Sequence, residues 1–296
     1  PMDDGSFALT DDLLSFVGPQ GPLPATGHRW LDPETLEIVF DPQSAPGAYT
    51  MILGPQILDA TGMALDQDGD GIPGEAPDDQ YTATFVVVQP LGTVAYVEFD
   101  GLDPSQGELW YQFETMRPGV LTLQANYQVG LGNVELALYD QSGTDPPVAV
   151  STPTYGNRRI DRQVAAPGEL YYLKVSGSNA DVSLCLANLL NRNGDGVTVF
   201  GTDGADRFEF ETAVARQVTV NNLRYEFDTS EVSSIAFEGG AGEDVATFQG
   251  TAEVETAQLW PDHGVVTGGD YTATVTGTEF VTVRGGANDV AHLYDS

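Results

Sequence analysis

The sequence is poor in cysteine and has no long apolar run. Its single cysteine, Cys185, excludes an internal disulfide framework, and its place in the alternating stretch DVSLCLANLL predicts a small, buried core side chain. No apolar run approaches the ~18 residues of a membrane-spanning helix, so we expect no membrane insertion. No signal peptide is recognisable, and the opening PMDDGSF is not typical of a native start. We therefore expect a mature or excised part of a longer protein.

Basic residues are also scarce. The 296 residues include 11 Lys and Arg, of which only Lys174 is a lysine, against 44 Asp and Glu, for a formal charge of −33. So negative a surface repels phosphate backbones and anionic headgroups, which argues against nucleic-acid and membrane-surface binding. The same surface attracts divalent cations. Adaptation to salt is the alternative explanation of the charge.

Sustained helical periodicity is absent as well. Short runs of alternating apolar residues recur instead, separated by turns rich in the 34 Gly and 18 Pro, and they lie at 35–40, 81–88, 94–99, 120–126, 133–139 and 169–175. This pattern predicts an all-β fold. Breaks near Gln89-Pro90 and at NRNGDG (191–196) predict three regions, 1–89, 90–190 and 191–296, of which the second is a sandwich of antiparallel sheets.

The third region contains an internal repeat. VTVFGTDGADRFEF (197–210), IAFEGGAGEDVATF (235–248) and VTVRGGANDVAHL (281–293) each carry alternating apolar residues on both sides of a glycine-rich turn that ends in an aspartate. These aspartates are Asp206, Asp244 and Asp289, which are 38 and 45 residues apart. Such a period indicates stacked units that bury their apolar faces on one another. We expect a short β-solenoid or β-roll, with a third small sandwich as the alternative.

Three resemblances accompany these patterns. FALTDDLLSFVGPQG, GAYTMILGPQILDATGMALDQDGDG and DDQYTATFVVV, within 7–88, resemble a bacterial immunoglobulin-like module of large secreted surface proteins. LWYQFETMRPGVLTLQA, NVELALYDQSG and APGELYYLKVSG, within 91–188, resemble the pre-peptidase C-terminal (PPC) domain, a jelly-roll-like sandwich appended to many secreted bacterial enzymes and surface proteins. Residues 197–293 loosely resemble the calcium-dependent, glycine/aspartate-rich RTX repeats.

These resemblances imply an extracellular protein without catalytic activity of its own. The PPC likeness implies a non-catalytic accessory module. In the immunoglobulin-like family a first strand precedes the position of PMDDGSF, and that strand is missing here. The module is then incomplete and exposes an open edge, so we expect a preceding segment or a partner chain to supply the missing strand.

The strongest motif is MALDQDGDGIPGEAPDD (63–79), which lies between two predicted strands. Three aspartates at alternate positions can point inward in a tight loop that turns at Gly71, the DxDxDG pattern that suits calcium. Without a cation, three such carboxylates repel one another. We therefore predict a calcium loop rather than a solvated acidic turn, with ligands drawn from Asp66, Asp68, Asp70, the carbonyl group of Ile72, Glu75, Asp78 and Asp79.

This loop is not an EF-hand. Pro77 stands where an EF-hand needs its bidentate glutamate, and Pro73 and Pro77 prevent an exiting helix. Glu75, Asp78 and Asp79 are therefore the residues that can close the ligand shell.

NRNGDG is a weaker copy of the same motif. Its candidate ligands are Asn191, Asn193 and Asp195, and a simple turn between regions is an equal alternative. The repeat aspartates are a third candidate. Because RTX nonapeptides run in tandem and these units do not, a standard calcium roll cannot form, and we favour the capping of glycine corners.

No catalytic constellation is recognisable. His28, His263 and His292 lie far apart, and the sequence contains no G-x-S-x-G, H-E-x-x-H or phosphate-loop motif. With 44 acidic residues, pairs of carboxylates carry no information about glycosidase chemistry. We predict that the chain is not an enzyme.

The patterns together predict a calcium-stabilised structural or adhesive segment of a secreted or cell-surface bacterial protein, such as a stalk, surface layer or fibre. Its expected partners are calcium ions and other surface-protein subunits or neighbouring domains, with assembly through strand donation to the open edge. The alternative is an accessory carbohydrate- or substrate-binding module of a larger secreted enzyme. Trp30, Trp110 and Trp260 would then be platforms for glycans rather than core aromatics.

Overall fold

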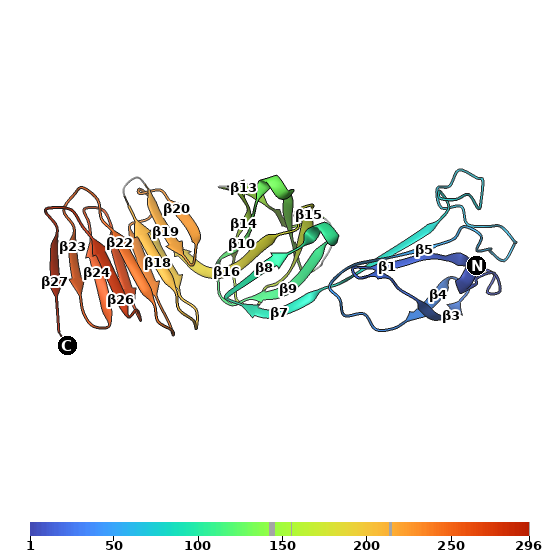
Figure 1. The fold of residues 1–296 in the computed structure, drawn as a ribbon, viewed down its shortest axis with the longest axis horizontal. Coiled ribbons are helices and arrows are strands. Elements are labelled where there is room, and N and C mark those ends of the chain that lie inside the picture. The colour runs from blue at the N-terminus through green and yellow to red at the C-terminus, as the bar shows by residue number, and fades with distance from the viewer. Residues whose placement is uncertain (142–145, 155, 213–214, 296) are drawn as a thin grey trace.

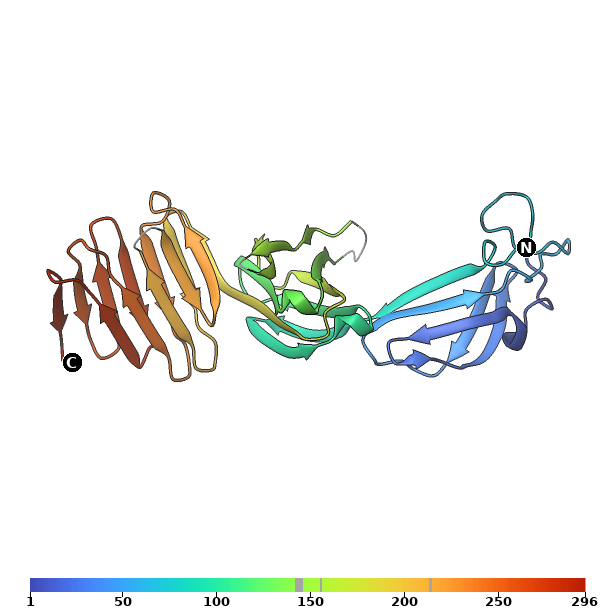
Figure 2. The ribbon, with the colours of Figure 1, turned by 45° about the horizontal axis from the view of Figure 1, so that its top comes forward.

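The computed structural model is all-β, as predicted, and describes residues 1–141, 146–154, 156–212 and 215–295. Three β regions follow one another along one long axis, with the two termini at opposite ends (Figures 1 and 2). The helical elements in the described residues are the single turn α1 (Leu9–Asp12) and the 3-10 turns η1 (Pro104–Gln106) and η2 (Val129–Leu131). None of the helices found there is long and apolar enough to span a bilayer.

The first region consists of a four-stranded antiparallel sheet and a separate hairpin. The sheet has the order β2-β1-β5-β6, and the hairpin pairs β3 with β4. Strand β5 (GAYTMIL) alternates buried and less buried residues, so Tyr49, Met51 and Leu53 face the core. The strands are β1 (Leu13–Gly18), β2 (Gly21–Pro22), β3 (Ala25–Asp32), β4 (Thr35–Phe40), β5 (Gly47–Leu53) and β6 (Tyr81–Val87).

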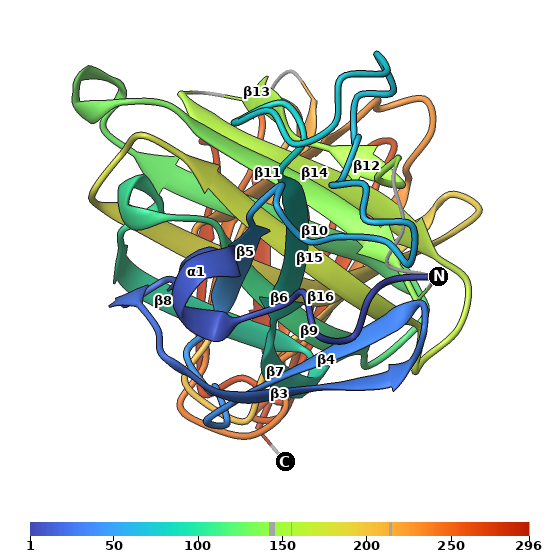
Figure 3. The same ribbon diagram turned by 90° about the vertical axis from the view of Figure 1, so that its right-hand side faces the viewer.

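Within the described part of the chain, no strand pairing joins the sheet and the hairpin of the first region. In the described residues, β4 pairs with β3 alone and β6 with β5 alone, so the outer edge of each strand is unpaired. Figure 3, which looks from the N-terminal end, shows the β3–β4 hairpin at some distance from β5 and β6. That a preceding segment or a partner chain supplies a further strand here stays a prediction.

The second region is a sandwich of two sheets. One sheet has the order β12-β11-β15-β9-β7; in the other, β13-β14-β10-β16 run side by side and β8 adds to β16. Apolar residues from both sheets form one core, in which Leu121, Leu123, Leu138 and Leu173 are fully buried. The strands are β7 (Gln89–Val94), β8 (Tyr96–Leu102), β9 (Leu109–Thr115), β10 (Gly119–Tyr127), β11 (Val134–Asp140), β12 (Ala149–Val150), β13 (Thr152–Thr154), β14 (Asn157–Val164), β15 (Leu170–Gly177) and β16 (Val182–Asn193). The run predicted at 94–99 is divided between the end of β7 and β8.

The third region is a stack of coils, as the solenoid interpretation predicts. Strands β17, β21 and β25 pair in parallel in one sheet, and β18, β22 and β26 pair in parallel in the facing sheet. Inward side chains such as Phe208, Phe237 and Phe248 stack between the sheets. The antiparallel pairs β19–β20 and β23–β24 interrupt the coils. The strands are β17 (Gly196–Phe200), β18 (Arg207–Glu211), β19 (Arg216–Val220), β20 (Leu223–Phe227), β21 (Ser234–Glu238), β22 (Val245–Gln249), β23 (Thr256–Leu259), β24 (His263–Thr267), β25 (Thr272–Thr276), β26 (Phe280–Arg284) and β27 (Val290–Leu293).

The third sequence repeat is half a coil out of phase with the first two. Residues 197–210 and 235–248 both run from the β17-β21-β25 sheet to the facing sheet, whereas residues 281–293 run back from β26 to β27. Strand β27 pairs with β23, so Asp289 stands at the edge opposite Asp206 and Asp244. The alignment of the three motifs as equivalent rungs is therefore wrong, because the similar corner sequences serve both edges of the stack.

The core of the third region extends into the second region, whose own core is a separate cluster. The predicted limit at 190/191 falls inside β16, which continues through β17 into the solenoid sheet. Cys185 is buried in the cluster that includes the solenoid core, as predicted for this thiol. The Tyr225 hydroxyl also donates to Oγ1 of Thr122 (3.0 Å), and its ring lies 4.7 Å from the guanidinium of Arg159. These two regions are thus joined through side chains as well as backbone.

Candidate functional site

The acidic loop between β5 and β6 is built around a buried carboxylate, Asp79. Its side chain is fully buried, with Oδ1 accepting the backbone N–H of Gln67 (2.7 Å) and Oδ2 that of Glu75 (2.8 Å). These donors, first of all the N–H of Glu75, lower the pKa of Asp79 against the opposing effect of burial. Asp79 is therefore held ionised at the base of the loop.

Two exposed aspartates face this buried group. Asp66 accepts the N–H groups of Gly69 (2.9 Å) and Gly71 (3.2 Å), and Asp68 accepts that of Asp70 (3.1 Å). Gly69 and Gly71 have φ values of 73° and 88°, a left-handed backbone that glycine adopts without strain. One carboxylate oxygen each from Asp66, Asp68 and Asp79 lies within 4.8 Å of the other two.

The carboxylates of the other predicted acidic ligands lie outside this group of three, and the carbonyl of Ile72 stays a predicted ligand. Oδ1 of Asp70 accepts the backbone N–H of Ile72 (2.8 Å), and Ile72 is 57% exposed. Desolvation raises the pKa of Glu75, and the charges of Asp70 and Asp79 add to the effect. Asp78 adds to it as well but does not join the three oxygens. Sequence reasoning offered Glu75, Asp78 and Asp79 as equivalent closing residues, and only the folded loop distinguishes Asp79.

The spacing of the three oxygens suits a divalent cation. Calcium binds hard oxygen ligands at ~2.3–2.6 Å, so two oxygens on opposite sides of the ion are ~4.6–5.2 Å apart at most. The 4.8 Å limit within the group agrees with this geometry. Three carboxylates at this distance repel one another unless a cation lies between them, and the exposed side leaves room for water ligands.

The NRNGDG candidate forms a tight hairpin turn. Asn191 and Asn193 belong to the β16–β17 ladder, in which they pair with Thr198 and Gly196. The carboxylate of Asp195 accepts the hydroxyl of Ser233 (2.6 Å), a bond that also lowers the pKa of Asp195. The turn is tied to the next coil in this way.

The repeat aspartates cap the corners of the coils. Asp206 accepts the N–H of Thr202 (2.6 Å), and its own N–H donates to Asp244 (2.8 Å) of the next coil. Asp244 in turn donates its N–H to Oε2 of Glu279 (2.7 Å). At the opposite edge, the N–H of Glu255 donates to Asp289 (2.9 Å). The carboxylates of Asp244, Glu279 and Asp289 therefore each join two successive coils, whereas that of Asp206 caps its own corner.

The sequence alone did not identify Glu255 and Glu279 as acids that accept hydrogen bonds at the corners of the coils. A usable signal exists for Glu255, because glycine precedes the acid by five residues at Gly201/Asp206, Gly239/Asp244 and Gly250/Glu255. A Cβ on any of these glycines would lie within 2.8 Å of the carboxylate oxygen of its acid. The glycine is needed because the acid folds back over it.

Two of the three candidate tryptophans, Trp110 and Trp260, pack against other rings, whereas Trp30 lines a groove. Trp260 stacks between His263 (4.3 Å) and Tyr294 (4.5 Å), so other rings cover its faces. Trp110 packs against Tyr139 at 5.4 Å. In the described part of the chain, the acidic loop holds the sole group of three or more His, Cys, Asp or Glu side chains with converging ligand atoms.

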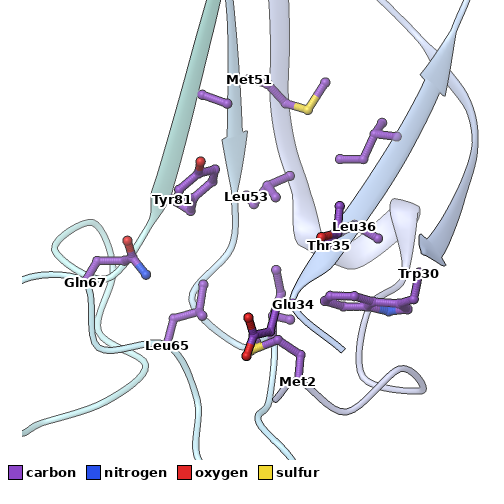
Figure 4. Close-up of a pocket in the computed structure, with 13 residues that line it drawn as sticks. Met2, Trp30, Glu34, Thr35, Leu36, Met51, Leu53, Leu65, Gln67 and Tyr81 are labelled. Carbon is purple, nitrogen blue, oxygen red and sulfur yellow. The ribbon is translucent and has the colours of Figure 1, made fainter. Parts of the chain in front are cut away.

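A groove of about 460 Å³ opens beside the acidic loop, between the β3–β4 hairpin and strands β5 and β6. Figure 4 shows Trp30 and Leu36 on the hairpin side, facing Leu53 and Tyr81 across it. Met2 and Leu65 close its lower end. The groove is apolar, and the unpaired edges of β4 and β6 border it.

Solved structures match parts of the chain, and two distant likenesses illustrate this similarity. The PPC domain of a collagenase from Bacillus anthracis is 17% identical, with a TM-score of 0.27, over 34% of this chain and 92% of that chain. PliG of Aeromonas hydrophila, a periplasmic inhibitor of g-type lysozyme, is 13% identical, with a TM-score of 0.23, over 33% of this chain and 96% of that chain. No protein-family model matches the chain, and no curated protein matches it in sequence. Likenesses this weak carry no argument about function.

Proposed function

We propose that this chain is a calcium-stabilised structural or adhesive segment of a secreted or cell-surface bacterial protein. The observation that supports this most directly is the convergence of Asp66, Asp68 and the buried Asp79 in one loop. A bound cation offsets the repulsion between the three carboxylates, and its binding energy adds to the stability of the first region. The extended arrangement of three β regions suits a stalk, surface layer or fibre (Figure 1).

Calcium titration with matched loop variants tests this proposal. Asp66→Asn and Asp79→Asn remove a charge from the group of three, whereas Asp70→Asn removes one from the same loop outside that group. We expect calorimetry to detect calcium binding that is weakened at least ~10-fold in the first two variants and much less in the third. We also expect chelation to lower the Tm of the wild type. Equal affinity in all four proteins, or an unchanged Tm, would refute the calcium role.

We also propose that the first region assembles by accepting a strand at the open edge of β4. The apolar groove and the unpaired backbone of β4 and β6 support this mode, because an added strand both pairs its backbone and inserts alternate side chains. A peptide of alternating valine and threonine is a suitable probe. Amide exchange of β4 should slow when it binds, while β10 serves as an internal control. Unchanged exchange in β4 at saturating peptide would count against strand acceptance.

A further inference from the structure

A polar cavity of about 570 Å³ lies where the second region meets the first coil of the solenoid, two parts of the molecule that adjoin in Figure 1. Its wall on the second region includes Tyr96 and Arg117, and its wall on the solenoid includes Phe200, Asp203 and Glu238. None of these residues belongs to the acidic loop or to the groove of the first region. Charges of both signs line this cavity, in a chain with few basic residues.

Arg117 comes from the turn between β9 and β10 and is held from two sides. Its backbone N–H donates to Oδ1 of the buried Asn188 (2.8 Å), and its guanidinium lies 4.4 Å from the centre of the Phe200 ring. The acceptor found for this guanidinium in the part of the chain that the structure describes is Sδ of Met116 (3.4 Å), a weak one. Its Nη1 is buried there without a hydrogen-bond partner. A positioned cation therefore lacks a strong acceptor.

Two carboxylates line the same cavity from the solenoid without pairing with Arg117. Glu238 ends β21 beside Phe200 of the parallel ladder, and Asp203 lies in the corner that follows β17; both acids are exposed. Burial lowers the pKa of Arg117 and the charge of Glu238 raises it, so these two charges lie near each other. None of the ion pairs in the described residues joins them. The space between them is complementary to a ligand that carries both charges.

We propose that this cavity binds a free α-amino acid with an apolar side chain, as its zwitterion. The carboxylate of the ligand accepts hydrogen bonds from the guanidinium of Arg117, and its ammonium group donates to the carboxylate of Glu238. Both are charge-assisted bonds, which are stronger than neutral ones. Tyr96 and Met116, which is 43% exposed, give apolar surface for the side chain of the ligand.

The charge of the whole chain favours a zwitterion over a simple anion. A formal charge of −33 repels an anionic ligand over long range, whereas a zwitterion has no net charge to be repelled. A simple cation would face the charge of Arg117 and would leave that guanidinium without an acceptor. A zwitterion satisfies both walls of the cavity at once.

Calorimetry with three matched ligands tests the proposal. L-phenylalanine carries both charges, N-acetyl-L-phenylalanine lacks the ammonium group, and L-phenylalaninamide lacks the carboxylate. We expect phenylalanine to bind and each analogue to bind at least ~10-fold more weakly, because each loses a charge-assisted hydrogen bond. Equal affinity for the three ligands, tighter binding of an analogue, or no binding of phenylalanine at ~10 mM would overturn the proposal.

Variants of the chain locate the site. Glu238→Gln removes one charge at an exposed position, and Glu211→Gln does the same at the exposed end of β18 in the facing sheet. We expect the first variant to bind phenylalanine at least ~5-fold more weakly and the second to bind it as the unmodified chain does. Arg117→Gln should abolish binding, and if this variant fails to fold, Glu238→Gln still decides. Unchanged affinity in Glu238→Gln would refute the assignment.

These measurements are made in the presence of a calcium chelator. The acidic loop lies in the first region, whereas the cavity is formed by the second and third. Binding of phenylalanine should therefore survive chelation, and its failure would leave the proposed calcium role untouched.

Discussion

The backbone N–H of Asp206 donates a 2.8 Å hydrogen bond to Oδ1 of Asp244, 38 residues further along the chain. The two residues occupy the same corner in successive coils, and both are almost fully buried. The second oxygen of Asp244, Oδ2, is buried without a hydrogen-bond partner. Desolvation raises the pKa of Asp244, and the charges of Asp206 and Glu279 raise it further. The acids at this corner, Asp206, Asp244 and Glu279, therefore stabilise the stack through their hydrogen bonds rather than through their charge.

Asp244→Ala should destabilise the third region. The substitution leaves the buried N–H of Asp206 without an acceptor, which costs ~1–3 kcal/mol. Asp244→Asn retains an acceptor at the same place and should lose less. Denaturant unfolding followed in the third region measures both, and an alanine variant as stable as the wild type would contradict the role of the bond.

Gly239→Ala should be more damaging than any change to the acids. A Cβ at this position would overlap the carbonyl oxygen of Gly277 in the next coil. Because backbone of the neighbouring coil cannot move without breaking the stack, we expect a loss of at least ~3 kcal/mol, in the upper range for one substitution. Gly204→Ala is the control, since its Cβ meets only Oγ1 of Thr202, at 3.6 Å. Similar unfolding curves for the two variants would refute this explanation.

Arg216→Lys should not be a conservative change. The Arg216 side chain is 2% exposed, its guanidinium lies 5.0 Å from the Tyr271 ring, and it contacts the carbonyl of Val232 and the carboxylate of Asp270. An ammonium group cannot reproduce this planar set of contacts, so we expect the Tm to fall by several degrees. Arg207→Lys, at an exposed pair with Glu209, should leave the Tm within about one degree. The comparison is made by differential scanning calorimetry.

The acidic loop should lose stability at low pH when calcium is absent. The pKa of Asp79 is lowered by the N–H groups of Glu75 and Gln67. A carboxyl group whose pKa is lower in the folded state stabilises the fold above its unfolded value, ~3.9, and this contribution disappears as pH falls through the folded value. The amide resonances of Gln67 and Glu75 should therefore titrate with an apparent pKa below ~3.9. Asp79→Asn should abolish that titration, and its persistence in this variant would assign it to another group.

Much of the fold can be predicted from local pattern. The alternating runs at 35–40, 81–88 and 120–126 correspond to β4, β6 and β10, because a period of two is a property of each strand alone. The stacked third region is also recognisable, since a repeated corner is written in consecutive residues.

The candidate site could be predicted only in part. DxDxDG marks the loop, but the pattern does not distinguish Asp70, which bonds to Ile72, from Asp79, which lies beyond it and is buried. Likewise, similar corner motifs do not reveal that Asp289 belongs to the edge opposite Asp244. Both outcomes depend on contacts between residues far apart in the chain.

The sequence by itself determined that the chain forms strands, where it turns, and that it carries a large excess of negative charge, because these follow from residue types and their local spacing. The tertiary structure decided which carboxylates converge and which coil edge each acid caps. The reason is physical: a carboxylate takes its role from the N–H groups and charges brought beside it, and those neighbours are placed by strand pairing over tens of residues.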